Sequence, residues 1–321
     1  MKNQKILVTG VGGDIGVNIL RCLKEGSYAN DLIGCDRDPY AWGRSVSPKF
    51  LQAPSALEKV AYEQFIQNTV KKYNIGYVYP GSESEILFFH KHRDSFKDWG
   101  IKVLINNAMI VDNFLDKYKT AIFLAEKNLP SPKTFLLEQY KGELSYPFIL
   151  KKRWGSGSKL VLVVCNQNEF EFYKNKFGIE SLIVQEYLGS EEHEYTAGVF
   201  SNGNQTYSIL FRRYLASDVG ITKFAEFIEE NPIAELASRI AEVSHLIGSI
   251  NIQFRKVNNK FIPFEINPRI SGTAYIRHYF GFHDIEWWLK LLMKKEIKTY
   301  DSKFNKGIAV RAVQEVFLDV S

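Results

Sequence analysis

The chain has 321 residues, enough to bury a substantial core and to form two or three domains. Hydrophobic residues make up 45% and charged residues 24%, which is ordinary for a folded soluble protein and excludes a disordered chain. The formal net charge of +5 comes from scattered lysines and arginines without a long run, so a nucleic-acid-binding arm is not expected.

No sequence feature points to a membrane or to an oxidising compartment. Cys22, Cys35 and Cys165 are odd in number and show no paired spacing, which argues against a disulfide framework and a zinc site. No apolar stretch reaches membrane-spanning length, and glycines and Asp14 interrupt the first one, so it is not a secretory signal. We therefore expect a cytoplasmic protein with no membrane or nucleic-acid partner.

The first third of the chain alternates between strand and helix patterns. Apolar runs predict strands at 5–8, 32–35, 77–79 and 101–104, and helical patterns cover 15–23 and 61–73. Alternation of this kind is typical of an α/β domain with a parallel sheet. We expect this domain to close near residue 110.

A glycine-rich turn, Gly10 to Gly16, joins the first predicted strand to the first helix. Glycines at this place allow phosphate to approach a helix N-terminus, and Asp36 ends the second strand where a ribose-binding acid would lie. The same turn also serves a tight strand-to-helix connection without a cofactor. An NAD(P)-dependent oxidoreductase therefore stays open as an alternative.

The middle of the chain is predicted to hold a helix at 114–127, a linker at 128–132, and strands at 148–151, 160–164, 182–187 and 195–200. Lys151 ends a strand just before a glycine-serine loop. Such a lysine can reach phosphate as a point charge, and the amides of the loop can close over phosphates. The alternative is a flexible turn beside a surface lysine.

Further on, the strand at 182–187 leads into a glycine, a charged stretch and then Glu194. A strand that leaves a sheet edge exposes backbone groups suited to an adenine edge, and a carboxylate nearby can accept both ribose hydroxyls. Taken separately, each is an ordinary strand with a surface glutamate. The remaining patterns predict helices at 231–247 and 284–293 and a last strand at 307–317.

Two strands in 249–272 carry the strongest signal. Ile252, Phe254, Phe264 and Ile266 alternate with polar residues, as in strands buried on one face. If residues 258–260 form a three-residue loop, Val257 faces Phe261 and Gln253 faces Glu265, with Asn267 on the same side as Glu265.

Three oxygen-bearing side chains thus converge, and Arg269 follows just past the strand end. Magnesium binds through one or two carboxylates together with substrate phosphates, and Arg269 could balance charge on a transferring phosphoryl group. The alternative is a half-exposed hairpin with a polar outer face, which does not explain why Asn267-Pro268-Arg269 stands at the end of the strand.

In this order the motifs resemble the ATP-grasp superfamily, most closely the ATP-binding halves of the carbamoyl-phosphate synthetase large subunit. The resemblance implies a Rossmann-like domain at 1–110 and an ATP-grasp domain at 111–321. The grasp part would consist of two α+β subdomains, a lid subdomain at about 120–187 and a C-terminal subdomain at about 188–321.

The resemblance also implies roles for individual residues. ATP would be held by Lys117 and Lys151, by the lid residues Gly155, Ser156, Gly157 and Ser158, by the adenine hinge Glu186, Tyr187 and Leu188, and by Glu194 at the ribose. Mg²⁺ or Mn²⁺ would be held by Gln253, Glu265 and Asn267. Arg269 would contact the transferred phosphoryl group, and Lys223 resembles a further phosphate-side lysine.

The function that the resemblance implies is an ADP-forming ligase that activates a carboxylate as an acyl phosphate for attack by an amine or another nucleophile. One such unit stands alone here, so complete carbamoyl-phosphate synthesis is not expected. Small-molecule substrates are the expected partners, and a homodimer stays open. A non-catalytic ATP-binding module is the second alternative, because its binding residues would be the same.

Overall fold

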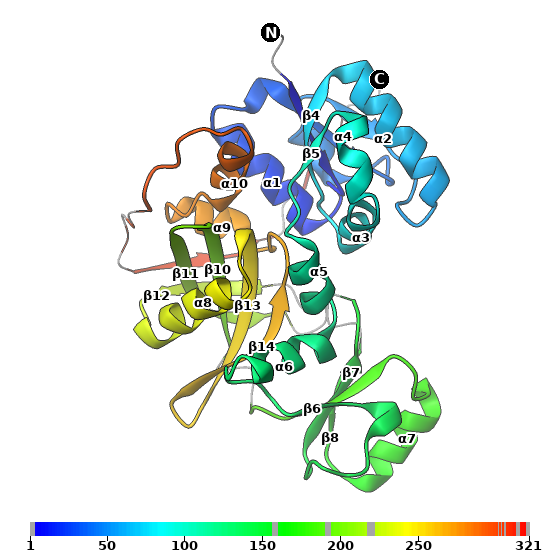
Figure 1. Cartoon of the computed structure of the whole chain (residues 1–321), viewed down its shortest axis with the longest axis vertical. Coiled ribbons are helices and arrows are strands. Elements are labelled where there is room, and N and C mark those ends of the chain that lie inside the picture. Colours follow the sequence, from blue (N-terminus) through cyan, green and yellow to red (C-terminus); the bar gives the residue numbers. More distant parts are fainter. Residues whose placement is uncertain are drawn as a thin grey trace.

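A computed structural model describes residues 4–155, 160–189, 194–216, 222–300, 302, 304, 306–312 and 315–318, and their strands form three sheets. Figure 1 shows the N-terminal sheet at the top, the sheet of the lid subdomain at the bottom, and the largest sheet between them. The first is parallel and the other two are antiparallel, which confirms the α/β class with an α+β grasp part.

The N-terminal sheet has the strand order β3-β2-β1-β4-β5. Its strands are β1 (Lys5–Thr9), β2 (Leu32–Asp36), β3 (Phe50–Gln52), β4 (Ile75–Tyr79) and β5 (Lys102–Val103). The α-helices that follow them are α1 (Asp14–Glu25), α2 (Lys59–Tyr73), α3 (Glu83–Lys91) and α4 (Phe96–Trp99). The order reverses between β1 and β4, so a crevice for ligands is expected where the carboxyl ends of these two strands diverge.

The middle sheet has six strands in the order β14-β13-β10-β11-β12-β15. They are β10 (Glu194–Asn202), β11 (Thr206–Leu215), β12 (Thr222–Ile228), β13 (Ile247–Val257), β14 (Lys260–Asn267) and β15 (Gly307–Val310). Alternate residues of β10 and β13 pack under α8 (Asn231–Val243), among them Ala197 and Ile252. The residues between them, including Glu194 and Gln253, therefore lie on the opposite face.

The lid subdomain holds the sheet β6-β9-β7-β8. Its elements are β6 (Thr134–Leu136), β7 (Phe148–Lys152), β8 (Val161–Val164), α7 (Gln167–Phe177) and β9 (Leu182–Glu186). Phe148, Leu150 and Val184 pack with Phe170 of α7 on one face of this sheet. Lys151 and Ile183, which alternate with them, consequently lie on the other face.

Connecting elements join the three sheets. Helices α5 (Ala108–Phe114) and α6 (Lys117–Glu126) lead out of the N-terminal sheet, and α9 (Ala274–Tyr279) and α10 (Asp284–Leu292) follow β14 and pack against α1. The short 3-10 helices are η1 (Ala29–Asp31), η2 (Trp42–Ser45), η3 (Arg93–Ser95) and η4 (Leu137–Gln139). The domain boundary expected near residue 110 falls within α5 and stays a prediction.

Three predicted elements differ from the structure. The helix expected at 114–127 begins only at Lys117, because Asp116 caps it by accepting from Tyr118 N and Lys119 N. The helix expected at 231–247 ends at Val243, and the positive φ of His245 turns the chain into β13. The last strand ends at Val310, well short of residue 317.

Candidate active site

The β13–β14 hairpin pairs the residues that the sequence predicts, but by a different route. Its loop has two residues, Asn258 and Asn259, both with the positive φ of a type I′ turn. Val257 pairs with Lys260, so the predicted three-residue loop and the pairing of Val257 with Phe261 are wrong. A register shift next to Gln253 compensates, and Gln253 faces Glu265 as predicted.

The residue that makes this shift is Phe264, which has no partner because Phe254 pairs with Pro263 and Gln253 with Glu265. The bulge takes Phe264 out of the buried face that Phe254 occupies, so its predicted place in the core is wrong. Its ring lies 5.8 Å from Lys151 Nζ and 5.5 Å from the Arg255 guanidinium. An aromatic side chain thus joins the polar face of the hairpin.

Glu265 is the carboxylate of this face. Asn267 Nδ2 donates to Glu265 Oε1 at 3.0 Å, and Asn251 stands opposite Asn267. Burial favours the protonated acid, but the charges of Lys117 and Lys151 and the hydrogen bond from Asn267 outweigh it, so the pKa of Glu265 is lowered. Glu265 is therefore an ionised carboxylate beside the amide side chains of Gln253 and Asn267.

Lys151 approaches Glu265 from the lid sheet, and only 5% of it is exposed. In the described part of the chain, its ammonium has no hydrogen bond or ion pair. Burial lowers the pKa of Lys151 from 10.5 to about 8, against the opposing charge of Glu265. A buried cation without a directly bonded counter-charge is costly, and an anionic ligand would offset that cost.

Lys117, the first residue of α6, is the second cation. Its Nζ donates to Gly155 O at 2.6 Å, at the base of the loop that the sequence predicts as a lid. Asp116 and Trp154 form a β-bridge here, and Arg153 Nε donates to Asp116 Oδ2 at 2.9 Å. Gly155 has a φ of +100°, which suits glycine. Ser156, Gly157 and Ser158, the other predicted lid residues, lie outside the described residues.

Arg269 completes the positive side of the site. Burial lowers its pKa, while the negative charges of Glu83 of α3 and of Glu265 act in the opposite direction. Its Nη1 donates to Ile270 O at 3.1 Å. Its Nε is buried and, among the described residues, has no partner. The Arg269 guanidinium, which has five N–H groups, thus keeps donors for a ligand, the buried Nε among them.

The predicted adenine hinge follows the end of β9. Glu186 is the last residue of the strand, and its carboxylate accepts from Lys133 N at 3.1 Å. Tyr187 and Leu188 continue without regular structure, and within the described ranges their backbone groups have no hydrogen bond. Free backbone donors and acceptors at this point are what an adenine edge requires.

Glu194, predicted at the ribose, is buried between two arginines that the sequence reasoning missed. Arg213 Nε donates to Glu194 Oε1 at 2.8 Å, and Arg255 Nη2 lies 2.9 Å from Oε2. Both residues follow the two-residue period of the polar face, which is the signal that could have found Arg255 from Gln253. Each carboxylate oxygen of Glu194 already has a charged partner, although it keeps capacity to accept further bonds.

Lys223 is exposed at the start of β12, in a register shift where Leu215 pairs with Thr222 and Tyr214 with Phe224. Its role as a phosphate-side lysine stays a prediction. The cations whose charges lower the pKa of Glu265 are Lys117, Lys151 and Arg213, and the sequence reasoning missed the last of these.

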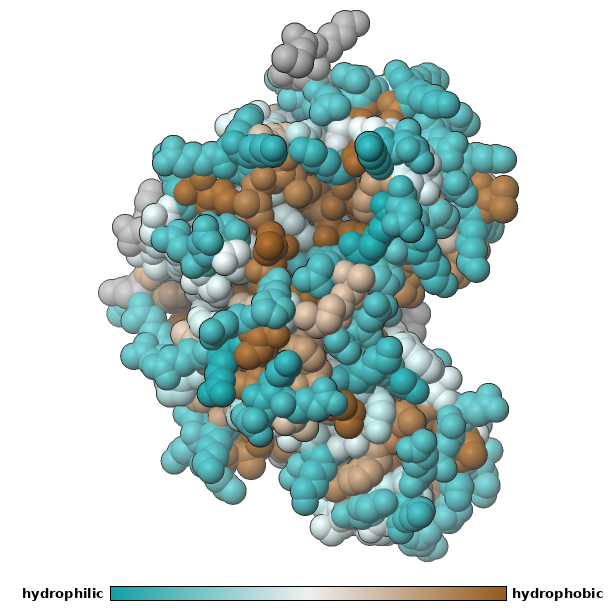
Figure 2. Space-filling view, viewed as in Figure 1, coloured by the Kyte–Doolittle hydropathy of each residue, from teal (hydrophilic) through white to brown (hydrophobic). Residues whose placement is uncertain are grey.

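An apolar wall lies next to Lys151 on the lid sheet. Val161 pairs with Lys151 and Val163 with Ile149, on the face away from α7. These two valines are 49% and 43% exposed. Figure 2 shows a notch between the lid subdomain at the bottom and the rest of the molecule. A flat apolar ligand would cover the two valines.

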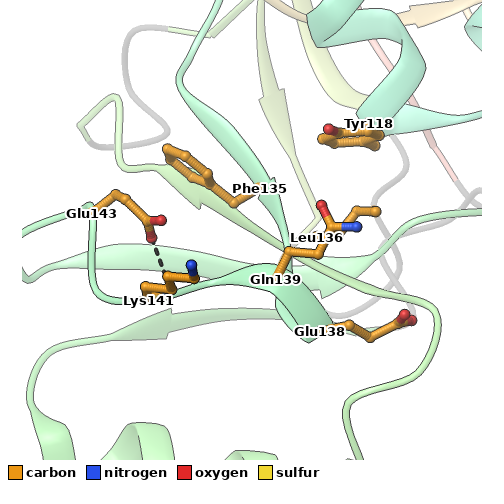
Figure 3. Close-up of a pocket in the computed structure, with 7 residues that line it drawn as sticks. All are labelled: Tyr118, Phe135, Leu136, Glu138, Gln139, Lys141 and Glu143. Carbon is orange, nitrogen blue, oxygen red and sulfur yellow. Dashed lines mark hydrogen bonds between the residues drawn. The ribbon is translucent and has the colours of Figure 1, made fainter.

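A cavity of about 600 Å³ lies elsewhere on the lid subdomain (Figure 3). Its lining comes from α6, β6, η4 and the turn that follows, where Lys141 N donates to Glu143 Oε2 at 2.8 Å. It shares no residue with the group around Glu265. The converging charges, rather than this hollow, mark the candidate site.

Comparisons with known proteins agree with this geometry. A family model described as "ATP-grasp in the biosynthetic pathway with Ter operon" matches residues 178–316. The chain is 25% identical over 231 residues to the carbamoyl phosphate synthase large chain of Agathobacter rectalis, a match that covers 65% of this chain. The chain is thus similar to ATP-grasp proteins. It spans only 21% of the length of that synthase chain.

Solved ATP-grasp structures share the fold along nearly the whole chain. The N5-carboxyaminoimidazole ribonucleotide synthetase of Thermus thermophilus superposes with a TM-score of 0.74 at 15% identity, over 95% of this chain and 82% of that one. The biotin carboxylase domain of the 2-oxoglutarate carboxylase of Hydrogenobacter thermophilus, solved with MgADP and bicarbonate, gives 0.75 at 14% identity, over 92% and 71%. The Rossmann-like and grasp parts are thus present together, as expected.

Proposed function

We propose that this protein is an ADP-forming ligase, which phosphorylates a carboxylate with ATP and passes the acyl group to an amine or another nucleophile. The observation that carries the proposal is the charge arrangement at Glu265. One ionised carboxylate stands among Lys117, Lys151 and Arg213, and the buried Lys151 has no directly bonded counter-charge in the described residues. This excess of positive charge suits a triphosphate.

The residues present fit a magnesium ion that arrives with ATP. Glu265, Gln253 and Asn267 offer one carboxylate and two amide oxygens, all hard ligands. Among the described residues no group of three or more His, Cys, Asp or Glu could hold a metal, so tight binding without phosphate is not expected. Mg²⁺, or Mn²⁺ in its place, would offset phosphate charge during an in-line transfer.

The rest of the nucleotide would lie along the lid face. Val161 and Val163 offer an apolar surface to the adenine ring, and the free backbone at Tyr187 and Leu188 can pair with its edge. Glu194, held by Arg213, can accept from ribose hydroxyls. Lys117 and Lys151 would contact the phosphates, with Gly155 at the base of the lid over them.

The chain's own residues would assist transfer mainly through charge and position. Arg269 follows shortly after β14 and donates to Ile270 O, so its position is set by the backbone, and its charge would stabilise the phosphoryl group. Closure of the lid would keep water from the acyl phosphate. The acceptor would enter from the crevice at the ends of β1 and β4, where Gly12, Asp14 and the start of α3 lie.

Release of ADP in the presence of the right carboxylate tests the proposal. Amino acids and sugar acids would be screened with MgATP, with and without an amine, by a coupled assay for ADP. We expect ADP formation that depends on one carboxylate class. ATP binding without such turnover, across the whole screen, would favour the non-catalytic ATP-binding module instead.

The oxidoreductase alternative fits the glycine turn less well. Gly12 N donates to Asp36 Oδ2 at 2.6 Å, and a Cβ on Gly12 would meet the same carboxylate. Asp36 thus occupies an amide that a pyrophosphate would need, and it adds a negative charge there. Calorimetry with NAD and NADP separates the two functions, because only the oxidoreductase predicts binding.

Replacing Lys151 with methionine should weaken nucleotide binding while leaving the free protein at least as stable. The affinity for MgADP should fall about 10- to 100-fold, since a charge-assisted contact is lost. In the free protein the buried charge is a cost, because burial holds the pKa near 8. Titration calorimetry and thermal unfolding at pH 7 measure the two effects.

The lowered pKa of Lys151 also predicts how the stability of the free protein depends on pH. Between pH 8 and 10.5 the unfolded chain holds a proton on Lys151 that the folded chain has lost, so this residue makes stability rise with pH in that window. The rise should be absent in the methionine variant. Lys71→Met, on the exposed side of α2, is the control. Parental MgADP affinity in the Lys151 variant would contradict the assignment.

A further inference from the structure

A buried ion pair lies beneath the segment that carries Arg269. Arg277 of α9 has no exposed surface, and its Nε and Nη2 donate to Asp284 Oδ1 and Oδ2 at 3.0 Å and 2.7 Å. Ser249 of β13 donates to Asp284 Oδ2 at 2.5 Å. The carboxylate is thus satisfied by two N–H groups of Arg277 and one hydroxyl.

The remaining nitrogen of the Arg277 guanidinium is directed elsewhere. Arg277 Nη1 donates to Ser271 Oγ at 2.8 Å, and Ser271 is two residues beyond Arg269. Ser271 Oγ also lies 2.8 Å from Thr273 Oγ1. The pairing with Asp284 does not require this bond, because it uses the other edge of the guanidinium. The bond connects a rigid core pair to residues 268–273, which we call the arginine loop.

Other buried groups fix the remaining parts of the arginine loop. Asn106 Nδ2 donates to Pro268 O at 3.0 Å, just before Arg269. Asn18 Nδ2 and Arg311 Nη2 donate to Gly272 O at 2.8 Å and 2.6 Å. Anchors before and after Arg269 thus determine where its Cα lies, while its Nε has no partner in the described part of the chain.

The neighbouring strand leaves space for Arg277. A Cβ on Gly198 of β10 would come within 2.8 Å of Arg277 Cδ and 3.1 Å of its Nε. The stem of Arg277 therefore lies directly on the backbone of β10, where its side-chain freedom is small. This packing holds the guanidinium in the orientation that serves both Asp284 and Ser271.

We propose that Arg277 is a positioning residue, which holds Ser271 and through it sets Arg269 so that the unpartnered Nε faces the γ-phosphate. The proposal rests on the proposed function, in which Arg269 contacts the transferred group. Arg277 itself is buried and touches no substrate. Its effect should therefore be seen only with ligands that carry a γ-phosphate.

The test compares two nucleotides on the full-length protein without any acceptor substrate. Calorimetry would give the Kd of Mg·AMP-PNP and of MgADP, and their ratio reports contacts to the γ-phosphate. Ser271→Ala removes the bond from Arg277 but keeps the buried ion pair. Ser249→Ala is the matched control, because it removes a hydroxyl from the other side of the same network. Arg269→Ala shows how far the ratio of the two Kd values changes when the whole arginine side chain is lost.

We expect Ser271→Ala to weaken Mg·AMP-PNP about tenfold relative to MgADP, a change typical of one charge-assisted hydrogen bond. Ser249→Ala should keep the parental ratio even where its melting temperature falls. Arg277→Lys, which keeps a positive charge beside Asp284 but lacks the second arm, should match Ser271→Ala. If Ser271→Ala does not fold, the same comparison of Kd values is made with Arg277→Lys alone.

Two outcomes overturn the inference and can be told apart. If Arg269→Ala changes the ratio but Ser271→Ala and Arg277→Lys do not, Arg277 has only a structural role and the proposed function stands. If Arg269→Ala itself leaves the ratio unchanged, Arg269 does not contact the γ-phosphate, and both the positioning role and that part of the proposed function fail.

Discussion

Replacing Arg269 with alanine should lower kcat about 100- to 1000-fold while MgATP binding stays measurable. The loss is that of one preorganised donor aimed at developing charge. Arg269 meets this description, because it follows Glu265 and Asn267 in the chain and keeps one buried N–H without a partner in the described residues. The measurement is ADP release with a carboxylate on which the parent protein turns over, together with calorimetry for MgATP.

Arg212→Ala is a suitable control for this variant. Arg212 belongs to the same middle sheet, and its Nη2 lies 2.8 Å from Glu226 Oε2. Its cross-strand partner in β10 is Tyr195, so Arg212 lies on the face of the sheet that α8 covers. Its loss should leave turnover close to parental. Unchanged turnover in Arg269→Ala, under conditions where the parent is active, would contradict the phosphoryl role.

Glu265→Ala should weaken MgATP binding about 100-fold, at the upper end of what loss of groups around a bound metal costs. Glu265 is the one carboxylate of the proposed metal face, and it also balances the charges of Lys117 and Lys151. Without it, those two cations would favour nucleotide that carries no metal. The affinity for ATP in EDTA should therefore fall much less than the affinity for MgATP.

Calorimetry with and without Mg²⁺ checks this prediction. Glu265→Gln separates charge from shape, since the amide keeps an oxygen near the ion but removes the negative charge. Glu229→Ala, at an exposed position after β12, controls for a change in net charge. A parental MgATP affinity in Glu265→Ala would show that the metal is held elsewhere.

The sequence was most informative where local pattern alone decides structure. Period-two alternation placed Glu265 and Asn267 on one face, whereas Gln253 came opposite Glu265 because the bulge at Phe264 offset the wrong loop length. The glycine turn with alternating elements indicated a parallel N-terminal sheet. Its strands β1, β2 and β4 were expected within one or two residues of their observed bounds. Both signals depend on neighbours in sequence, which a single chain displays directly.

Features that depend on distant partners could not be predicted. Alternation along β13 could have placed Arg255 on the polar face, but nothing near Glu194 in the sequence indicates that Arg213 and Arg255 pair with it. β11 and β12 mix aromatic and basic residues without a clear alternation, and they were not predicted as strands. The pairing of Arg277 with Asp284 is close in sequence, but its contact with Ser271 is visible only in three dimensions.

The extra residue Phe264 is an addition to the hairpin that its ladder does not need. Without Phe264, Pro263 would stay opposite Phe254 and Glu265 opposite Gln253, because these neighbouring pairs already alternate between the two faces of the sheet. The bulge instead supplies an aromatic ring close to Lys151 and Arg255. A protein that lacks Phe264 should therefore still bind Mg²⁺ with ATP, and lose only the contacts of that ring.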